Sequence, residues 1–232
     1  MSRDNYLLVK LYKVGLFSAV LSAICWIIYI LGATGNPDLR VMEDPETFFH
    51  AIQNARISFL MYGWGGVLGT LLVIPYLVAI YTSIKEKTPF GLIVLVISLV
   101  GIVLAMIGFM KPLTLVYLIS PIGLDANPEF IKTMQIAVLV MGEVVEVGWF
   151  IGSFLVFGLG IGLFAFLALR LSIGPNWINV IGMIGGISGV IWLAIFFPFL
   201  ETFGTLLRLF NILTIFIWSI GLSVALTRLK LE

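Results

Sequence analysis

The stretch GLIVLVISLVGIVLAMIGFM, residues 91–110, decides the fold of this chain, because none of its residues carries a charge. A helix needs roughly 20 apolar residues to cross a hydrocarbon core about 30 Å thick. This stretch therefore predicts a helix that spans a membrane.

The rest of the chain has the same character. Of its 232 residues 61% are hydrophobic and only 11% are charged, and the mean hydropathy is +1.16, whereas a soluble domain carries about 25% charged residues. Charge-free runs predict six transmembrane helices, at residues 14–33, 57–84, 91–110, 147–169, 177–200 and 209–227. We expect an all-α, polytopic membrane helix bundle, with residues 1–232 forming one transmembrane domain in contact with membrane lipid.

The basic residues indicate how these helices are oriented. With six spans both termini lie on one side, and that side carries eight Lys and Arg residues against five on the other. This bias predicts cytoplasmic termini. Dividing residues 128–170 into two spans would give a seven-span chain with six basic residues inside and seven outside, which removes the bias.

Two segments are longer than a bilayer requires. Asp44-Pro45-Glu46 and Asn127-Pro128-Glu129 are typical helix starts, with an Asx cap, Pro at the first helical position and an acid near the positive end of the dipole. We expect continuous helices from Pro45 to Ile84 and from Pro128 to Arg170. Each would cross the membrane and project beyond its outer face.

The two long segments also match each other at an offset of 83 residues. GTLLV (residues 69–73) aligns with GSFLV (residues 152–156), and both helix starts align as well. This predicts a helical-hairpin repeat that relates residues 45–110 to residues 128–193. The alternative is chance similarity between glycine-rich apolar helices.

The projecting pieces are themselves apolar. Phe48, Phe49, Ile52 and Phe59 mark one face of the first projection at roughly helical spacing. We expect the projections to pack together as a helical cap outside the membrane. Alternatively they lie in the headgroup layer as interfacial helices.

Glu143 and Glu146 interrupt an otherwise apolar run. At 1.5 Å per residue they lie roughly 36–40 Å from Arg170, which places them at the outer boundary of the membrane rather than at its centre. The same count brings further polar residues to this layer: Arg208, Arg56 and Lys111, with Asn211 one turn from Arg208. A side-chain nitrogen of one of these basic residues is expected within salt-bridge reach of a glutamate, because two bare carboxylates would repel each other.

Two interpretations of this charge layer stay open. It forms an outward-facing pocket for a small amphipathic or ionic ligand, in a binding or transport protein, or it staples helix ends together in a non-catalytic structural or accessory subunit. An intramembrane enzyme is a third alternative. No catalytic residue, cofactor or metal site is predicted, since Cys25 and His50 are the only residues of their kinds and no P-loop or HExxH motif occurs. A net charge of +1 gives no reason to expect nucleic acid as a partner.

The segments FFHAIQNARISFL (residues 48–60) and RLSIGPNWINVIGMIGG (residues 170–186), together with the overall plan, resemble a family of uncharacterised prokaryotic six-span membrane proteins that is catalogued as a domain of unknown function. The resemblance implies a bacterial or archaeal cytoplasmic membrane and brings no activity with it.

Overall fold

The computed structural model describes residues 3–39, 42, 44–122, 127–191 and 201–229. Every regular element in these ranges is helical, which confirms the all-α prediction. The elements are α1 (Arg3–Thr34), α2 (Pro45–Asn54), α3 (Arg56–Leu71), α4 (Val73–Ile84), α5 (Phe90–Thr114), the π-helical turn η2 (Leu115–Ile119), the 3-10 turn η3 (Ser120–Ile122), α6 (Pro128–Ser153), the π-helical segment η4 (Phe154–Gly160), α7 (Ile161–Arg170), α8 (Asn176–Ile191) and α9 (Glu201–Leu229).

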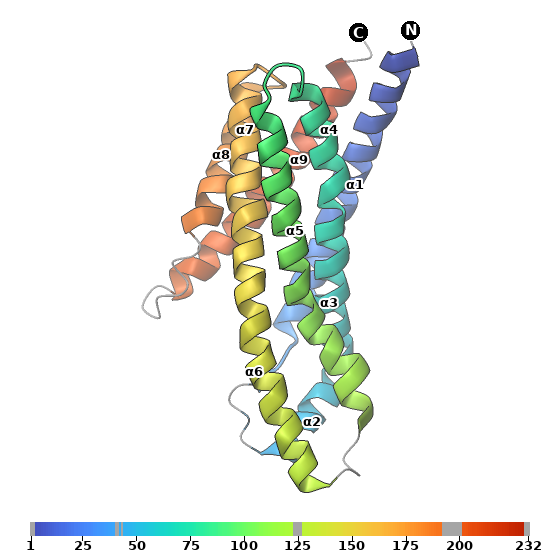
Figure 1. The fold of residues 1–232 in the computed structure, drawn as a ribbon, viewed down its shortest axis with the longest axis vertical. Helices are drawn as coiled ribbons and strands as arrows, with labels where there is room; N and C mark the ends of the chain where they lie inside the picture. The colour runs from blue at the N-terminus through green and yellow to red at the C-terminus, as the bar shows by residue number, and fades with distance from the viewer. Residues whose placement is uncertain (1–2, 40–41, 43, 123–126, 192–200, 230–232) are drawn as a thin grey trace.

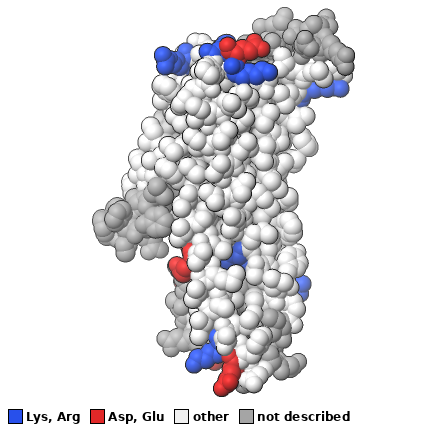
Figure 2. Space-filling model, in the orientation of Figure 1, with Lys and Arg blue, Asp and Glu red and all other residues white. Residues whose placement is uncertain are grey.

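Within the described ranges, five helical segments are long and apolar enough to cross a membrane, which indicates a membrane protein. They are Tyr6–Thr34, Arg56–Ile84, Phe90–Ile119, Glu129–Arg170 and Leu206–Arg228. The sixth predicted span, residues 177–200, begins within the shorter apolar helix α8, and its residues 192–200 lie outside the described part of the chain. Figure 2 shows charged side chains at both ends of the molecule, with a broad uncharged belt nearest the end that holds the termini.

Helices that are close in the sequence pack side by side as antiparallel pairs. α1 lies along α3 and α4, α5 lies along α6 and η4, and α8 lies along α9. The start of α1 and the end of α9 lie at the same end of the bundle as the turns before α5 and before α8 (Figure 1). α9 also contacts α1, so the last hairpin closes back onto the first helix.

Both predicted helix starts are confirmed. The Asp44 side chain accepts a hydrogen bond of 2.7 Å from the backbone N–H of Thr47, and Asn127 accepts one of 2.9 Å from Glu129. Pro follows each cap at the first helical position, where its missing N–H costs nothing.

The first long segment is not one continuous helix, and that prediction was wrong. α2 ends at Asn54. The next residue, Ala55, has backbone angles (φ −94°, ψ 14°) that are not helical, and a new helix begins at Arg56. A second interruption at Leu72 separates α3 from α4, three residues before Pro75. Pro75 has no N–H to donate to the preceding turn. The second long segment runs on to Arg170 but widens into the π-helical η4.

The end of the bundle opposite the termini has its own apolar cluster. Phe48, Phe49 and Ile52 of α2 are fully buried, and they pack with residues of α3, η2 and the start of α6. Gln135 of α6 adds a hydrogen bond of 2.7 Å from its Nε2 to the Met42 carbonyl, which ties the loop before α2 to α6.

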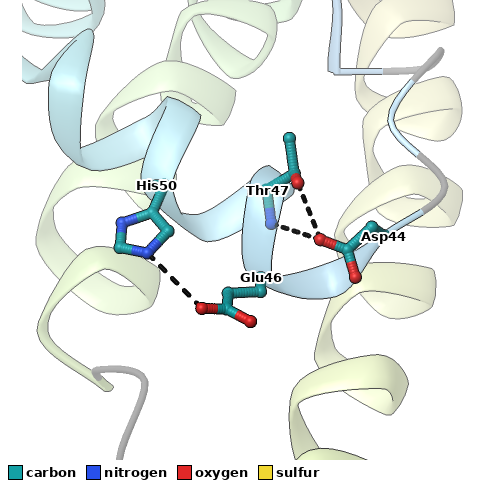
Figure 3. A network of polar contacts seen from close by, with 4 residues as sticks. All are labelled: Asp44, Glu46, Thr47 and His50. Atoms are coloured by element: carbon teal, nitrogen blue, oxygen red, sulfur yellow. Dashed lines mark hydrogen bonds and ion pairs between the residues drawn. The ribbon is translucent and has the colours of Figure 1, made fainter.

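The polar face of α2 is turned away from this cluster. Figure 3 shows Asp44, Glu46, Thr47 and His50 on its outer side. The hydroxyl and the backbone N–H of Thr47 donate to the Asp44 carboxylate, and they hold its pKa below the usual range. His50 Nε2 lies 3.9 Å from Glu46 Oε1.

Candidate functional site

Arg208 is the centre of the candidate site. It lies in the second turn of α9, and its guanidinium donates a hydrogen bond to the Tyr29 hydroxyl of α1. The guanidinium carbon also lies 4.7 Å from the ring centroid of Trp149 on α6 and 5.4 Å from that of Tyr29. A cation over an aromatic face is stabilised by the ring quadrupole, the more so where water is excluded. We refer to Arg208, Tyr29 and Trp149 as the Arg208 cluster.

A close helix contact fixes the position of Tyr29. At Gly65 of α3 an added Cβ would lie 2.7 Å from the Tyr29 nitrogen and 2.8 Å from the Cys25 carbonyl oxygen, so only glycine permits this approach. The Tyr29 ring is 1% exposed and stacks on Tyr62 of α3, with ring centroids 4.7 Å apart. The tight crossing of α1 and α3 therefore holds the hydroxyl that accepts from Arg208.

A second close contact fixes Trp149. An added Cβ at Gly152 would lie 2.6 Å from the Gly101 carbonyl oxygen of α5 and still closer to the Ala105 nitrogen. This presses α6 against α5 one turn after Trp149, whose ring is 8% exposed. These two contacts, together with the packing of α9 against α1, bring the members of the Arg208 cluster together.

A cavity of about 410 Å³ opens beside this cluster. Its walls carry charges of both signs among aromatic and aliphatic side chains, and we refer to it as the charged cavity. It is lined by Tyr29, Ala33, Asn36, Pro37, Asp38, Leu39, Phe59, Tyr62, Gly108, Lys111, Pro112, Leu115, Val138, Leu139, Val145, Glu146, Trp149, Phe150 and Arg208. These residues come from α1 and the loop after it, and from α3, α5, η2, α6 and α9.

The structure divides the predicted charge layer in two. Glu146, Lys111 and Arg208 all line the charged cavity and are partly buried. Glu143 and Arg56 are exposed and are not among the residues that line it. The spacing of three residues between the glutamates therefore does not place both carboxylates at one site.

The expected salt bridge is not formed within the described ranges. There, neither glutamate lies within 4.0 Å of a basic side-chain nitrogen. Lys111 instead crosses α6 at Gly142, where an added Cβ would lie 2.7 Å from its Nζ. Glu146 and Lys111 therefore face the same cavity as separate charges.

Asn211 belongs to a second, deeper cavity. This inner cavity shares Trp149 and Arg208 with the charged cavity and has a volume of about 30 Å³. Asn211 is 6% exposed, and its Nδ2 donates a hydrogen bond of 2.6 Å to the Gly185 carbonyl of α8. That bond joins α8 to α9 beside the inner cavity.

Sequence reasoning did not single out several residues of the charged cavity. Trp149 reads as an ordinary core or interfacial aromatic, and Tyr29 and Tyr62 carry no signal within their apolar runs. Asp38 reads only as one of several acidic residues between the first two spans. Helix contacts bring Trp149, Tyr29 and Tyr62 to the cavity, and Asp38 lies in the loop after α1.

Within the described ranges, no group of three or more His, Cys, Asp and Glu residues could hold a metal ion. Comparison of the chain with protein-family models, curated proteins and solved structures gives no match. The helices and cavities therefore define the class by themselves: an α-helical membrane protein with an amphipathic, charged cavity where α1 ends and α9 begins.

Proposed function

We propose that this protein binds or transports a small amphipathic or ionic ligand through the charged cavity. The observation that carries the proposal concerns Lys111 and Glu146. Both line one cavity of about 410 Å³, and they form no salt bridge with each other. Ligand pockets typically have volumes of about 300–1,000 Å³ and combine apolar walls with a few polar groups.

The two charges suit different parts of a ligand. The Glu146 carboxylate can accept hydrogen bonds from an ammonium or amide group, and the Lys111 ammonium can donate to a carboxylate or phosphate. Leu39, Phe59 and Leu115 supply apolar walls for the remainder. The cavity therefore favours a ligand that has both charged and apolar parts.

The staple interpretation requires the charges to hold helix ends together directly. A partly buried pair would contribute by close contact, and removing one partner would be costly. Because neither glutamate contacts a basic side chain in the described ranges, the pocket interpretation accounts better for the arrangement. A structural or accessory subunit remains the second candidate, and an intramembrane enzyme the third.

The proposed orientation follows from the basic residues and from the shared end of the termini. We place six spans in a prokaryotic cytoplasmic membrane, with both termini cytoplasmic and the charged cavity open to the outside. Single cysteines at Thr88 and Ser172 should then react with an impermeant reagent only from the cytoplasmic side, and one at Glu129 only from outside. Labelling of Ser172→Cys from outside would contradict six spans.

The cap is part of the same proposal. Phe48, Phe49 and Ile52 are fully buried against other protein elements, as expected of a cap that faces water. An interfacial helix would instead turn these side chains toward lipid.

The hairpin repeat, residues 45–110 against 128–193, also remains a proposal, and two helix contacts support it. Ser22 Oγ donates to the Gly69 carbonyl across α1 and α3, and Ala105 touches Gly152 across α5 and α6. Both residues of the second contact follow those of the first by the same 83-residue offset. The 83-residue offset therefore also relates the α1–α3 contact to the α5–α6 contact.

Ligand binding is tested by purifying the protein in lipid nanodiscs and identifying bound species by native mass spectrometry. The variant Glu146→Gln with Lys111→Gln should lose the bound species. The matched control, Glu143→Gln with Arg56→Gln, makes the same changes outside the cavity and should retain it. Equal retention by both variants contradicts the charged cavity as the binding site. Loss of thermal stability only in the cavity variant, with no species bound to either protein, favours the staple.

A further inference from the structure

The inner cavity raises a separate question, because it lies beyond the Arg208 cluster. Its walls come from α1, α4, α6, η4, α8 and α9. Along α9 it reaches from Arg208 to Ser219, which at 1.5 Å per residue is about 16 Å. It therefore extends from the charged cavity into the apolar segment Leu206–Arg228.

One buried hydroxyl in this cavity lacks a hydrogen bond. Ser153 is 4% exposed, and its Oγ has no hydrogen-bond partner among the residues that the structure describes. Some other helical serines bond back to a carbonyl of the preceding turn, as Ser188 does to Gly185 at 2.7 Å. Ser153 is the last residue before the π-helical η4, and such segments often occur at functional sites.

An unpaired buried hydroxyl is costly unless water completes its bonding. The inner cavity has a volume of about 30 Å³, and roughly 10–15 Å³ of such space is enough to hold one water. Asn211 and Ser219 also line the cavity and supply further polar groups. The site therefore has polar groups within a mainly apolar lining and is large enough for ordered water.

The Arg208 cluster separates this water site from the charged cavity. Trp149 and Arg208 line both cavities, and the guanidinium carbon lies 4.7 Å from the Trp149 ring centroid. The Tyr29 hydroxyl accepts from the same guanidinium and holds it in place. Displacement of the Trp149 ring would join the two cavities.

We propose that the inner cavity is a hydrated continuation of the charged cavity, which admits water-sized neutral polar molecules past Trp149. The two cavities together form a passage into the membrane-spanning part of the bundle. This goes beyond ligand binding in the charged cavity, and its test needs no ligand, so either proposal can fail while the other holds.

The chain contains a matched control for Ser153. Thr70 aligns with Ser153 at the 83-residue offset and is fully buried, and its hydroxyl likewise has no hydrogen-bond partner in the described part of the chain. It is not among the residues that line the inner cavity. The reaction rate of a thiol at position 70 therefore measures access to a buried site away from the inner cavity. The rate at position 153 measures access to an equally buried site that lines this cavity.

The experiment measures the rate at which methyl methanethiosulfonate, a small uncharged reagent, modifies single thiols, with intact mass as the readout. The native thiol is first removed by Cys25→Ser, in nanodisc-reconstituted protein. Ser153→Cys should react at least tenfold faster than Thr70→Cys. Adding Trp149→Ala should raise the rate at position 153 by a further tenfold and leave position 70 unchanged.

Ser219 is a second position that lines the inner cavity. The thiol of Ser219→Cys should react as fast as that of Ser153→Cys and respond in the same way to Trp149→Ala. Ser219→Cys replaces Ser153→Cys if the latter does not fold. Equal rates at the cavity positions and position 70 would overturn a hydrated inner cavity. A rate at the cavity positions that does not respond to Trp149→Ala would overturn entry past Trp149.

Discussion

Replacing Gly152 with Ala tests the helix contact that positions the candidate site. The new Cβ would lie 2.6 Å from the Gly101 carbonyl oxygen and closer still to the backbone nitrogen of Ala105, whereas ordinary contacts are about 3.5–4.0 Å. Both neighbours are backbone atoms and cannot rotate aside. α6 must therefore move away from α5 by about 1 Å, which also displaces Trp149.

Gly148, one turn earlier on the same helix, is the control. An added Cβ there meets only the Leu104 carbonyl oxygen at 3.9 Å, so Ala fits without movement. Each Gly→Ala change gains up to about 1 kcal/mol of helix propensity, and overpacking at Gly152 costs about 1–3 kcal/mol. Gly152→Ala should thus be less stable than Gly148→Ala by about 1–3 kcal/mol.

The free energy of unfolding of both variants can be measured in mixed micelles of mild detergent and dodecyl sulfate, with loss of helical circular dichroism as the signal. The difference between the two variants removes the shared propensity term and isolates the contact. If Gly152→Ala unfolds at the same denaturant fraction as Gly148→Ala, or at a higher one, the close packing of α5 on α6 is not what fixes this region.

Three further predictions concern other parts of the bundle. Ser22→Ala removes the donor of a buried interhelical hydrogen bond of 2.7 Å, so the same assay should register a loss of about 0.5–1.5 kcal/mol; unchanged stability would mean that the bond contributes nothing. Asn179→Leu removes a fully buried amide that donates to the turn before α8 and accepts from Trp218 Nε1; stability should fall by about 1–3 kcal/mol, whereas an equally stable variant would contradict a role for this amide. Because Thr47 holds the pKa of Asp44 below its usual range, the cap is fully effective above the unfolded carboxyl pKa of about 3.9 and is lost as the pH falls through the lower folded value. The protection of the α2 amides, measured as the intrinsic exchange rate divided by the observed rate at the same pH, should therefore fall in acid, and Asp44→Asn should abolish this loss; constant protection in the native protein would contradict it.

The fold class could be predicted because lipid imposes a constraint that each segment must meet on its own. A spanning segment has to satisfy its backbone polar groups internally and carry few charges, so residues 91–110 indicate a helix without reference to the rest of the chain. The helix starts at Pro45 and Pro128 are equally local, since each cap acceptor and its donor lie within three residues.

The break at Ala55 was not predictable from the same signals. Residues 45–84 contain good helix formers on both sides of Ala55, and a helical apolar face runs through Phe48, Phe49, Ile52 and Phe59. Those four side chains pack in one cluster with η2 and α6. The side chains that pack against α2 in this cluster are distant in sequence. The residues around Ala55 therefore carry no signal that α2 ends there.

The sequence alone determined that Glu143 and Glu146 lie at similar depth, beyond the middle of a long helix, with Arg208 and Lys111 at a comparable level. Only the tertiary structure decided that Glu146 lines the cavity while Glu143 is exposed. Depth depends on the rise per residue along one helix, which the sequence supplies. Residues three apart on a helix point about 60° away from each other. The rotation of α6 about its axis therefore decides which of the two carboxylates faces the cavity. That rotation is set by contacts with α5 such as Gly152 with Gly101.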